Sequence, residues 1–316
     1  MKIIGSGSAL PEQVVTNDDL SRILDTSDEW IVSHTGIRER HIIKEETLAE
    51  LATAAAQRAL QDAGLTADQL DLIICTSVLS DCVTPGSACF VAGGIGYHGK
   101  TLDVNGACTG FIKALDVADA YFAAGKAQRI LLVAAEKPSF LADWNNRSTC
   151  VLFGDGSGAV VLEKGGDGAC LATHLATEFN DAFLCMPGPV SNSPFTAPGK
   201  TGKLSMNGQE VYRFAVSSCV SDLRAVCDQA GVSLEQVDWF LLHQANQRIL
   251  NAAQLRLKQP KEKFPGNIAR CGNTSSACIP LLLDEMRRDG RLRDGQLVAL
   301  SAFGAGLTHG AALLRI

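Results

Sequence analysis

The sequence lacks any long apolar run and any surplus of basic residues. No stretch approaches the roughly 18–20 consecutive apolar residues that cross a bilayer, and residues 129–136 (RILLVAAE), typical of the longest, predict a buried strand. The chain has 28 Lys and Arg against 34 Asp and Glu, whereas a nucleic-acid-binding protein usually carries a basic excess. Residues 1–8 lack the apolar segment and cleavage site of a secretory signal. These absences predict a soluble, cytoplasmic protein with no membrane or nucleic-acid partner.

The 11 cysteines lack the spacing of a scaffold. Their number is odd, none belongs to a Cys-x-x-Cys pair, and the closest lie seven residues apart, as Cys75 and Cys82 do. This argues against a disulfide framework, a zinc ribbon and a thioredoxin-type redox motif. Cysteine otherwise packs as a small hydrophobe, so all but one are expected to fill the core.

What the sequence does contain is a repeat. Residues 61–75 and 228–242 match at a shift of 167, and each predicts a helix end, a glycine, a polar turn and a buried strand. Three ordered matches of this kind predict a duplicated α/β unit in which sheets lie between helices. The other two are a helix with a strand (108–124 and 130–135; 275–288 and 296–301) and a Phe-Gly motif with a strand (153–162; 303–313).

The repeat divides the chain into residues 1–165 and 166–316, and no linker rich in proline or serine separates the halves. We therefore expect the halves to pack as one body. Residues 180–205 differ from the rest, because proline, glycine, serine and asparagine are frequent there. That composition predicts surface loops or a flap over a site.

Cys108 stands apart from the other cysteines. Residues 102–115 (LDVNGACTGFIKAL) predict a short strand, a turn of small residues and an amphipathic helix that starts close to Cys108. The free N–H groups and partial positive charge of a helix start stabilise a thiolate, so a lowered pKa is expected. Gly106 and Gly110 leave room for a ligand. The pattern indicates a nucleophile, although small residues also precede helices that have no chemical role.

Candidate partners for this cysteine lie in the second half. His243 follows the buried strand 239–242, at the strand end where α/β proteins place functional groups. The alternative interpretation is that this histidine merely caps a loop. Asn273 lies in RCGNTSSAC (270–278), a pattern also typical of an ordinary turn before a helix. The segment 303–308 (FGAGLT) is suited to present backbone N–H groups to a carbonyl, because glycines adopt unusual dihedrals. It does not match a nucleotide-binding fingerprint.

With these residues in place, the chain resembles the β-ketoacyl-[acyl-carrier-protein] synthase III family, which initiates fatty-acid synthesis on the thiolase fold. The resemblance implies a duplicated five-layer α-β-α-β-α sandwich, in agreement with the repeat. Residues 1–165 would form the half with the nucleophile, and residues 166–316 the half with the histidine and asparagine. The matching motifs are TSDEWIV (26–32), TGIRER (35–40), ACTGF (107–111), FGDG (153–156), HQAN (243–246), GNTS (272–275) and AFGAG (302–306).

The resemblance implies a role for each candidate. Cys108 would attack an acyl-CoA and hold the acyl group as a thioester after CoA leaves. The N–H groups of Cys108 and Ala305 would form the oxyanion hole, although relatives usually have glycine at Ala305. His243 and Asn273 would donate hydrogen bonds to the malonyl thioester as decarboxylation turns it into an enolate. Phe303 would provide an apolar wall beside the departing carboxylate.

Substrate-binding residues also follow from the resemblance. Trp30 and Arg147 would hold the CoA adenine by stacking and cation–π contact, while His34 replaces an arginine that contacts CoA in many members. Thr84 replaces a phenylalanine at the floor of the acyl pocket in some relatives, which would widen the pocket. The implied set is Trp30, Arg147, Asn246, Phe303 and Thr84.

Polar and basic residues of the second half would dock the acidic carrier protein, because charge complementarity steers association. The implied docking residues are Gln244, Arg213, Arg248 and Arg256. No metal or prosthetic group is implied, since acyl-CoA is a substrate. The implied partners are acyl-CoA, malonyl-[acyl carrier protein] and a second copy of the chain, because the family is usually homodimeric.

Related enzymes differ at these positions. A degradative thiolase needs a second cysteine in segment 302–306, and chain-elongating synthases have a histidine where Asn273 stands. Plant-type polyketide synthases share the Cys-His-Asn set but are longer, and a non-catalytic partner subunit would be expected to lose Cys108. Initiation-type synthases with other acyl starters stay open, because primer choice depends on pocket shape. The leading prediction is decarboxylative Claisen condensation of a short acyl-CoA, above all acetyl-CoA, with malonyl-[acyl carrier protein].

Overall fold

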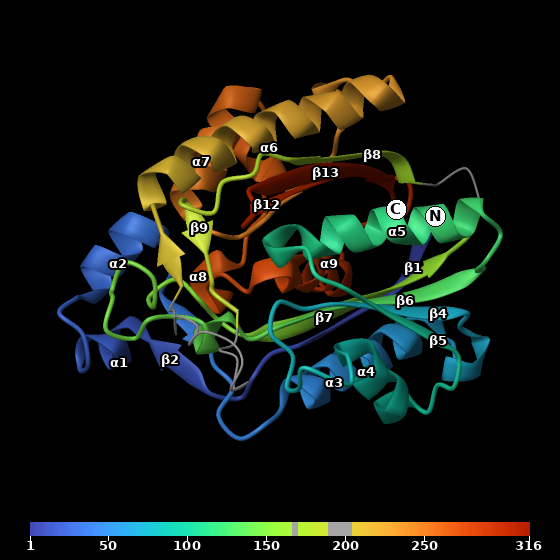
Figure 1. The fold of residues 1–316 in the computed structure, drawn as a ribbon. Helices are drawn as coiled ribbons and strands as arrows, with labels where there is room; N and C mark the ends of the chain where they lie inside the picture. The colour runs from blue at the N-terminus through green and yellow to red at the C-terminus, as the bar shows by residue number, and fades with distance from the viewer. Residues whose placement is uncertain (166–169, 189–203) are drawn as a thin grey trace, which may run out of the picture.

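The computed structural model describes residues 1–316 except 166–169 and 189–203. Two sheets alternate with three layers of helices, so that the chain forms five layers (Figure 1). The outer layers are α3 (Leu48–Ala63) with α4 (Ser87–Ile95), and α6 (Gly208–Ala230) with α7 (Gln247–Leu257). The middle layer is α5 (Gly110–Ala123) with α9 (Cys278–Arg288). No helix in the described ranges is long and apolar enough to cross a membrane.

The two sheets repeat one topology, which confirms the duplicated unit. The first has the order β1-β7-β6-β4-β5 and the second β8-β13-β12-β11, with β4 parallel to β6 and β11 parallel to β12. β5 is the edge strand without a counterpart in the described part of the second half. The strands are β1 (Lys2–Ala9), β4 (Leu72–Thr76), β5 (Lys100–Val104), β6 (Arg129–Glu136), β7 (Gly156–Glu163), β8 (Cys170–Thr177), β11 (Trp239–Leu242), β12 (Leu297–Gly304) and β13 (Thr308–Arg315).

The outer helices begin and end where local sequence predicts. The Thr47 side chain accepts the Glu50 N–H and the Glu50 carboxylate accepts the Thr47 N–H, which satisfies the free donors of the first turn of α3. The helices α3 and α6 both stop at a left-handed glycine, Gly64 with φ 65° and Gly231 with φ 64°. The repeat found in the sequence is therefore a repeat of helix-ending geometry.

The middle helices are buried by a sheet on either side. Apolar side chains of α5 and α9 such as Phe111, Leu115 and Leu282 are completely buried in one cluster shared with both sheets. Burial of this kind stabilises a core by roughly 1.5–3 kcal/mol per large apolar side chain. The N-termini of these two helices meet inside the molecule, and this places the functional residues described below.

The prediction that ten cysteines fill the core needs a correction. Six are buried (Cys75, Cys150, Cys219, Cys227, Cys271 and Cys278), and all 11 are free thiols. Cys82 and Cys89 are exposed, because they lie on the loop before α4 and on α4 itself, beside the edge strand β5. The predicted boundary at residue 166 and most of the segment 180–205 lie outside the described residues, so both stay predictions.

Candidate active site

Cys108 lies on a single 3-10 turn, Ala107–Thr109, that runs directly into α5. The predicted position at a helix start is confirmed. Ala107 has a φ of 47°, a left-handed conformation that costs a non-glycine residue energy and persists only where the surroundings enforce it. The second half repeats this turn at Ser275–Ala277 before α9, and Ser275 has a φ of 52°.

A cavity of about 430 Å³ opens over this turn. Cys108, His243, Asn273 and Phe303 all line it, so the structure brings together residues that are far apart in the sequence. Leu184 and Met206 also line the cavity. In the sequence they lie on either side of residues 189–203, the part of the predicted flap that the structure does not describe. Further lining residues from the prediction are Trp30, His34, Arg147, Asn246 and Arg248.

His243 follows β11 and is almost completely buried. Its backbone N–H donates to the Ser301 carbonyl at 2.8 Å, and its ring meets Phe303 edge-on with 5.2 Å between centroids. Burial lowers the pKa of His243 to about 3, so the imidazole is neutral. Its buried Nδ1 has no hydrogen-bond partner among the described residues. Because an unpaired N–H is rarer in protein interiors than an unpaired acceptor, the proton belongs on Nε2.

Asn273 is held by its own turn. Its Oδ1 accepts the Ser275 N–H at 2.9 Å, and its backbone N–H donates to the Leu152 carbonyl at 2.8 Å. The backbone of this segment therefore does form an ordinary turn before a helix, as one of the two interpretations of the sequence held. With Oδ1 occupied in this way, the amide Nδ2 is the part of the side chain left to act as a donor in the cavity.

The glycine-rich segment approaches the nucleophile from β12. A Cβ added to Gly304 would lie 3.0 Å from both the Cβ and the backbone N of Cys108, so only glycine fits there without displacement. The predicted unusual dihedral occurs at Gly306, with φ 141°, and not at Gly304. Ala305 does not have a positive φ, so its methyl group causes no backbone strain of this kind.

The lowered pKa expected for Cys108 is wrong for the free protein. Burial raises the pKa of the thiol to about 12, and a hydrogen bond from the Ser275 hydroxyl opposes this only in part. The thiol is therefore protonated at neutral pH, because the helix start does not compensate for the loss of water.

Two groups near this thiol, Ser275 and Glu136, were not predicted from the sequence. Ser275 lies with its Oγ 3.6 Å from the Cys108 Sγ, and Glu136 accepts hydrogen bonds from Ser275 and Ser276. Two signals could have found them. Glu136 is the last residue of the buried strand β6, much as His243 directly follows β11, and the turn that contains Ser275 repeats the turn of Cys108.

Trp30 and Arg147, the two residues predicted to bind adenine, contact each other. The Arg147 guanidinium carbon lies 4.8 Å from the Trp30 ring centroid, and the His34 ring stacks on the same indole at 4.3 Å. An adenine would have to displace one of these two neighbours in order to stack on Trp30. Asn246 caps α7, accepting the Arg248 N–H and donating to the His34 carbonyl.

Two predicted positions lie elsewhere. Gln244 is wrong as a docking residue, because it is completely buried and donates to the Leu242 carbonyl at 2.7 Å. Thr84 is exposed and does not line the cavity of its own chain. The three docking arginines are exposed on the neighbouring helices α6 and α7, and Arg213 forms an ion pair with Glu210.

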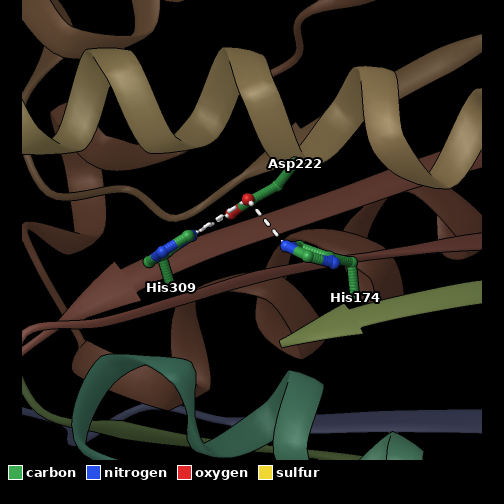
Figure 2. Close-up of side chains that lie close together, drawn as sticks. All are labelled: His174, Asp222 and His309. Atoms are coloured by element: carbon green, nitrogen blue, oxygen red, sulfur yellow. Dashed lines mark hydrogen bonds and ion pairs between the residues drawn. The ribbon is translucent and has the colours of Figure 1, made fainter. Parts of the chain in front are cut away.

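A separate polar cluster lies under α6 (Figure 2). The buried Asp222 carboxylate lies between two imidazoles, 2.8 Å from Nδ1 of His309 on β13 and 3.6 Å from Nε2 of His174 on β8. Burial raises the pKa of Asp222, and the hydrogen bond from His309 opposes this. The carboxylate thus links the helix to two strands of the second sheet.

Comparisons with known proteins agree with this geometry. The family model for 3-oxoacyl-[acyl-carrier-protein] synthase III matches residues 102–178, and the model for its C-terminal part matches residues 227–316. A β-ketoacyl-[acyl-carrier-protein] synthase III of Xanthomonas axonopodis pv. citri is 45% identical over 99% of this chain and 98% of its own length.

Solved structures give the same result. The 3-oxoacyl-[acyl-carrier-protein] synthase III of Aquifex aeolicus has a TM-score of 0.93 at 44% identity, covering 100% of this chain and 99% of that chain. A priming β-ketosynthase from a polyketide pathway has a TM-score of 0.91 at 31% identity, covering 99% of this chain and 96% of that chain.

Proposed function

The chain belongs to the β-ketoacyl-[acyl-carrier-protein] synthase III family of condensing acyltransferases, and we propose that it starts fatty-acid chains from a short acyl-CoA, above all acetyl-CoA. The acyl group is condensed with malonyl-[acyl carrier protein], giving 3-oxoacyl-[acyl carrier protein], CoA and CO₂. The observation that carries the proposal is that Cys108, His243 and Asn273 line one cavity.

The first half-reaction uses the nucleophile and the glycine-rich segment. The Cys108 sulfur attacks the acyl-CoA carbonyl, and CoA leaves with the acyl group held as a thioester. The N–H of Cys108 precedes the hydrogen-bonded ladder of its helix, so it can bind the developing oxyanion. Gly304 brings the segment with the Ala305 N–H against Cys108, and this closeness supports Ala305 as the second donor.

The second half-reaction uses the two donors of the other half. Nε2–H of His243 and Nδ2–H of Asn273 bind the malonyl thioester oxygen, which gains negative charge as CO₂ leaves. Phe303, packed against the His243 ring, keeps water from this end of the cavity and so favours loss of the carboxylate's charge. The enolate carbon then attacks the acyl-enzyme and releases the Cys108 sulfur.

Radiolabelled acetyl-CoA tests the assignment directly. Wild-type protein should retain label that survives denaturation, while Cys108→Ser should retain none as a thioester. Absence of label on the wild type, or equal label on both, would refute the proposal. A panel of acetyl-, isobutyryl-, butyryl- and octanoyl-CoA compared by kcat/KM then gives the primer, and strict acetyl preference would refute the widened pocket inferred from Thr84.

The partners and setting follow from the same substrates. Arg213, Arg248 and Arg256 are exposed beside the cavity helices, as docking of an acidic carrier protein requires. We place the reaction in the cytoplasm, with a homodimer as the working form. Val83, an apolar residue that is 94% exposed on the loop of Thr84, supports a dimer in which that loop faces a second copy.

A further inference from the structure

We propose that Glu136 accepts the proton of the Cys108 thiol, passed through the Ser275 hydroxyl, when the acyl group is transferred to Cys108. This rests on the proposed function, in which Cys108 is the acyl-accepting nucleophile. Glu136 does not touch the substrate in this scheme, so it is a positioning residue that acts through Ser275.

The Ser275 hydroxyl lies between the two ends of the path, and its oxygen can accept the thiol proton while its single O–H donates to Glu136. Ser275 Oγ lies 3.6 Å from Cys108 Sγ and 3.3 Å from Glu136 Oε1. The same Oε1 accepts the Ser276 hydroxyl at 2.5 Å, and Oε2 accepts the Val78 N–H at 3.1 Å. One hydroxyl therefore lies within reach of both the atom that loses the proton and the atom that gains it.

The backbone holds Ser275 in this place. Ala107 and Ser275 are two of the three described non-glycine residues with positive φ, and they occupy matching positions in the two halves. Such conformations persist only where the surroundings enforce them, and here both flank the thiol.

The surroundings of Glu136 allow its carboxyl group to gain and lose a proton near neutral pH. The titratable groups that face it are the thiols of Cys75 on β4, Cys108 before α5 and Cys278 on α9, and no cation neutralises it among the described residues. Burial raises the pKa of Glu136 to about 7. A base works best near the pH of the reaction, whereas the neutral His243, with a pKa of about 3, is a poor acceptor.

The proton balance closes over one turnover. The Sγ–H proton moves to Ser275 Oγ while the Ser275 hydroxyl proton moves to Glu136, and the sulfur forms its bond to the acyl carbon. CoA leaves as a thiolate and takes a proton from water. When the enolate attacks the acyl-enzyme, Cys108 leaves as a thiolate, and Glu136 returns the stored proton through Ser275. The overall reaction consumes one proton from solution, as loss of the malonyl carboxylate as CO₂ requires.

Glu136→Gln and Ser275→Ala test the path, with the exposed Glu262→Gln as a matched control. Alanine can adopt the left-handed backbone conformation of Ser275, because Ala107 has a similar φ at the matching position of the first half. Single-turnover transfer of label from acetyl-CoA to Cys108 is measured from pH 5.5 to 9, beside malonyl-[acyl carrier protein] decarboxylation, which needs no thiol proton.

We expect acylation at pH 7 to fall about 10²–10⁴-fold in both variants, the usual contribution of a general base. The acylation rate of Glu136→Gln should rise about tenfold per pH unit with the thiolate fraction, instead of levelling near pH 7. Acylation should fall at least tenfold more than decarboxylation. Wild-type acylation rates and pH profile in Glu136→Gln, or equal losses in both half-reactions, would overturn the relay. An unlabelled wild-type protein would instead refute the proposed function.

Discussion

The residues at the centre of the site are neutral in the resting protein. Burial keeps the Cys108 thiol protonated and the His243 imidazole uncharged, and Asn273 has no charge to lose. Charge therefore develops only as a substrate reacts, and the groups that stabilise it are dipoles already held in place. The contribution of each donor can therefore be measured by a substitution that removes its N–H group.

Asn273→Asp replaces the donor amide with a carboxylate of almost the same shape, so it removes the N–H donor and adds a negative charge. The aspartate keeps an oxygen for the Ser275 N–H but has no N–H for the enolate oxygen. We expect malonyl decarboxylation to fall by at least about 10²–10³-fold, the usual cost of one oxyanion-hole donor, because the carboxylate also repels the enolate. Acylation of Cys108 by acetyl-CoA should change far less. A variant that decarboxylates at the wild-type rate would show that Asn273 only shapes the turn.

Glu136→Gln also has a consequence for stability, separate from any role in catalysis. Because the pKa of Glu136 is raised from 4.5 to about 7, the folded state holds its proton longer than the unfolded state does. Its contribution to stability is full below pH 4.5 and is lost as the pH rises to about 7. The glutamine variant should match wild type near pH 4.5 and exceed it by about 3 kcal/mol at pH 8.

Urea unfolding at pH 5, 6, 7 and 8 measures this difference, with Glu262→Gln as the control for loss of an exposed carboxylate. A constant difference across this range would mean that Glu136 is ionised at all of these pH values. In that case the carboxylate could not store a proton at neutral pH.

Between elements, the Asp222 cluster is a buried polar contact outside the cavity. It fixes α6 to β13 and β8 at the place where β13 pairs with β12, which ends beside Cys108. Asp222→Ala leaves the His309 N–H buried without its acceptor. We expect a loss of about 3 kcal/mol in the free energy of unfolding.

The matched control is Asp228→Ala, which removes an exposed carboxylate from the same helix and should change stability by less than about 0.5 kcal/mol. His309→Ala and the double variant complete a mutant cycle. If the two single losses simply add, Asp222 and His309 do not stabilise each other and the contact is incidental.

The elements themselves were largely predictable, since helix caps, buried strands and the repeat are local signals. Strand β6 was expected at 130–135 and spans Arg129–Glu136, and the helix expected from 108 begins at Gly110. Burial of single side chains was not predictable in the same way. Gln244 follows His243 in a polar motif, yet the close packing of 266–267 against it buries it completely.

The site shows the same limit. The sequence placed Cys108, His243 and Asn273 in one cavity through the resemblance. It could not show that burial overcomes the helix start at Cys108, because burial depends on the whole fold. Ser275 reaches the thiol and lies beside Glu136 only because the turns before α5 and α9 meet, and that meeting is a property of the two packed halves.

At the scale of the whole molecule, both large sheets are open and end in an edge strand on either side. β5 lies at the edge of the first sheet, and an exposed edge invites pairing with another chain. The adjoining loop carries Val83, which is 94% exposed, and it packs on this strand through Gly86 and Ala88, which contact Asp103. An apolar side chain this exposed beside an open strand supports a homodimer formed along β5.

Val83→Asp tests this surface without disturbing the core of the single chain. We expect wild-type protein to sediment at about twice 33.4 kDa and Val83→Asp to shift toward 33.4 kDa, because the interface would bury an unpaired charge. Ile23→Asp is the control, since Ile23 is also an exposed apolar residue (66%) and closely follows α1 (Asn17–Ser21) in the sequence. In Figure 1, α1 and β5 lie at opposite sides of the molecule. A wild type of 33.4 kDa would refute the dimer, and equal shifts in both variants would place the interface elsewhere. If the dimer dissociates in Val83→Asp and its preference among acyl-CoA primers changes as well, Thr84 shapes the acyl pocket of the neighbouring copy.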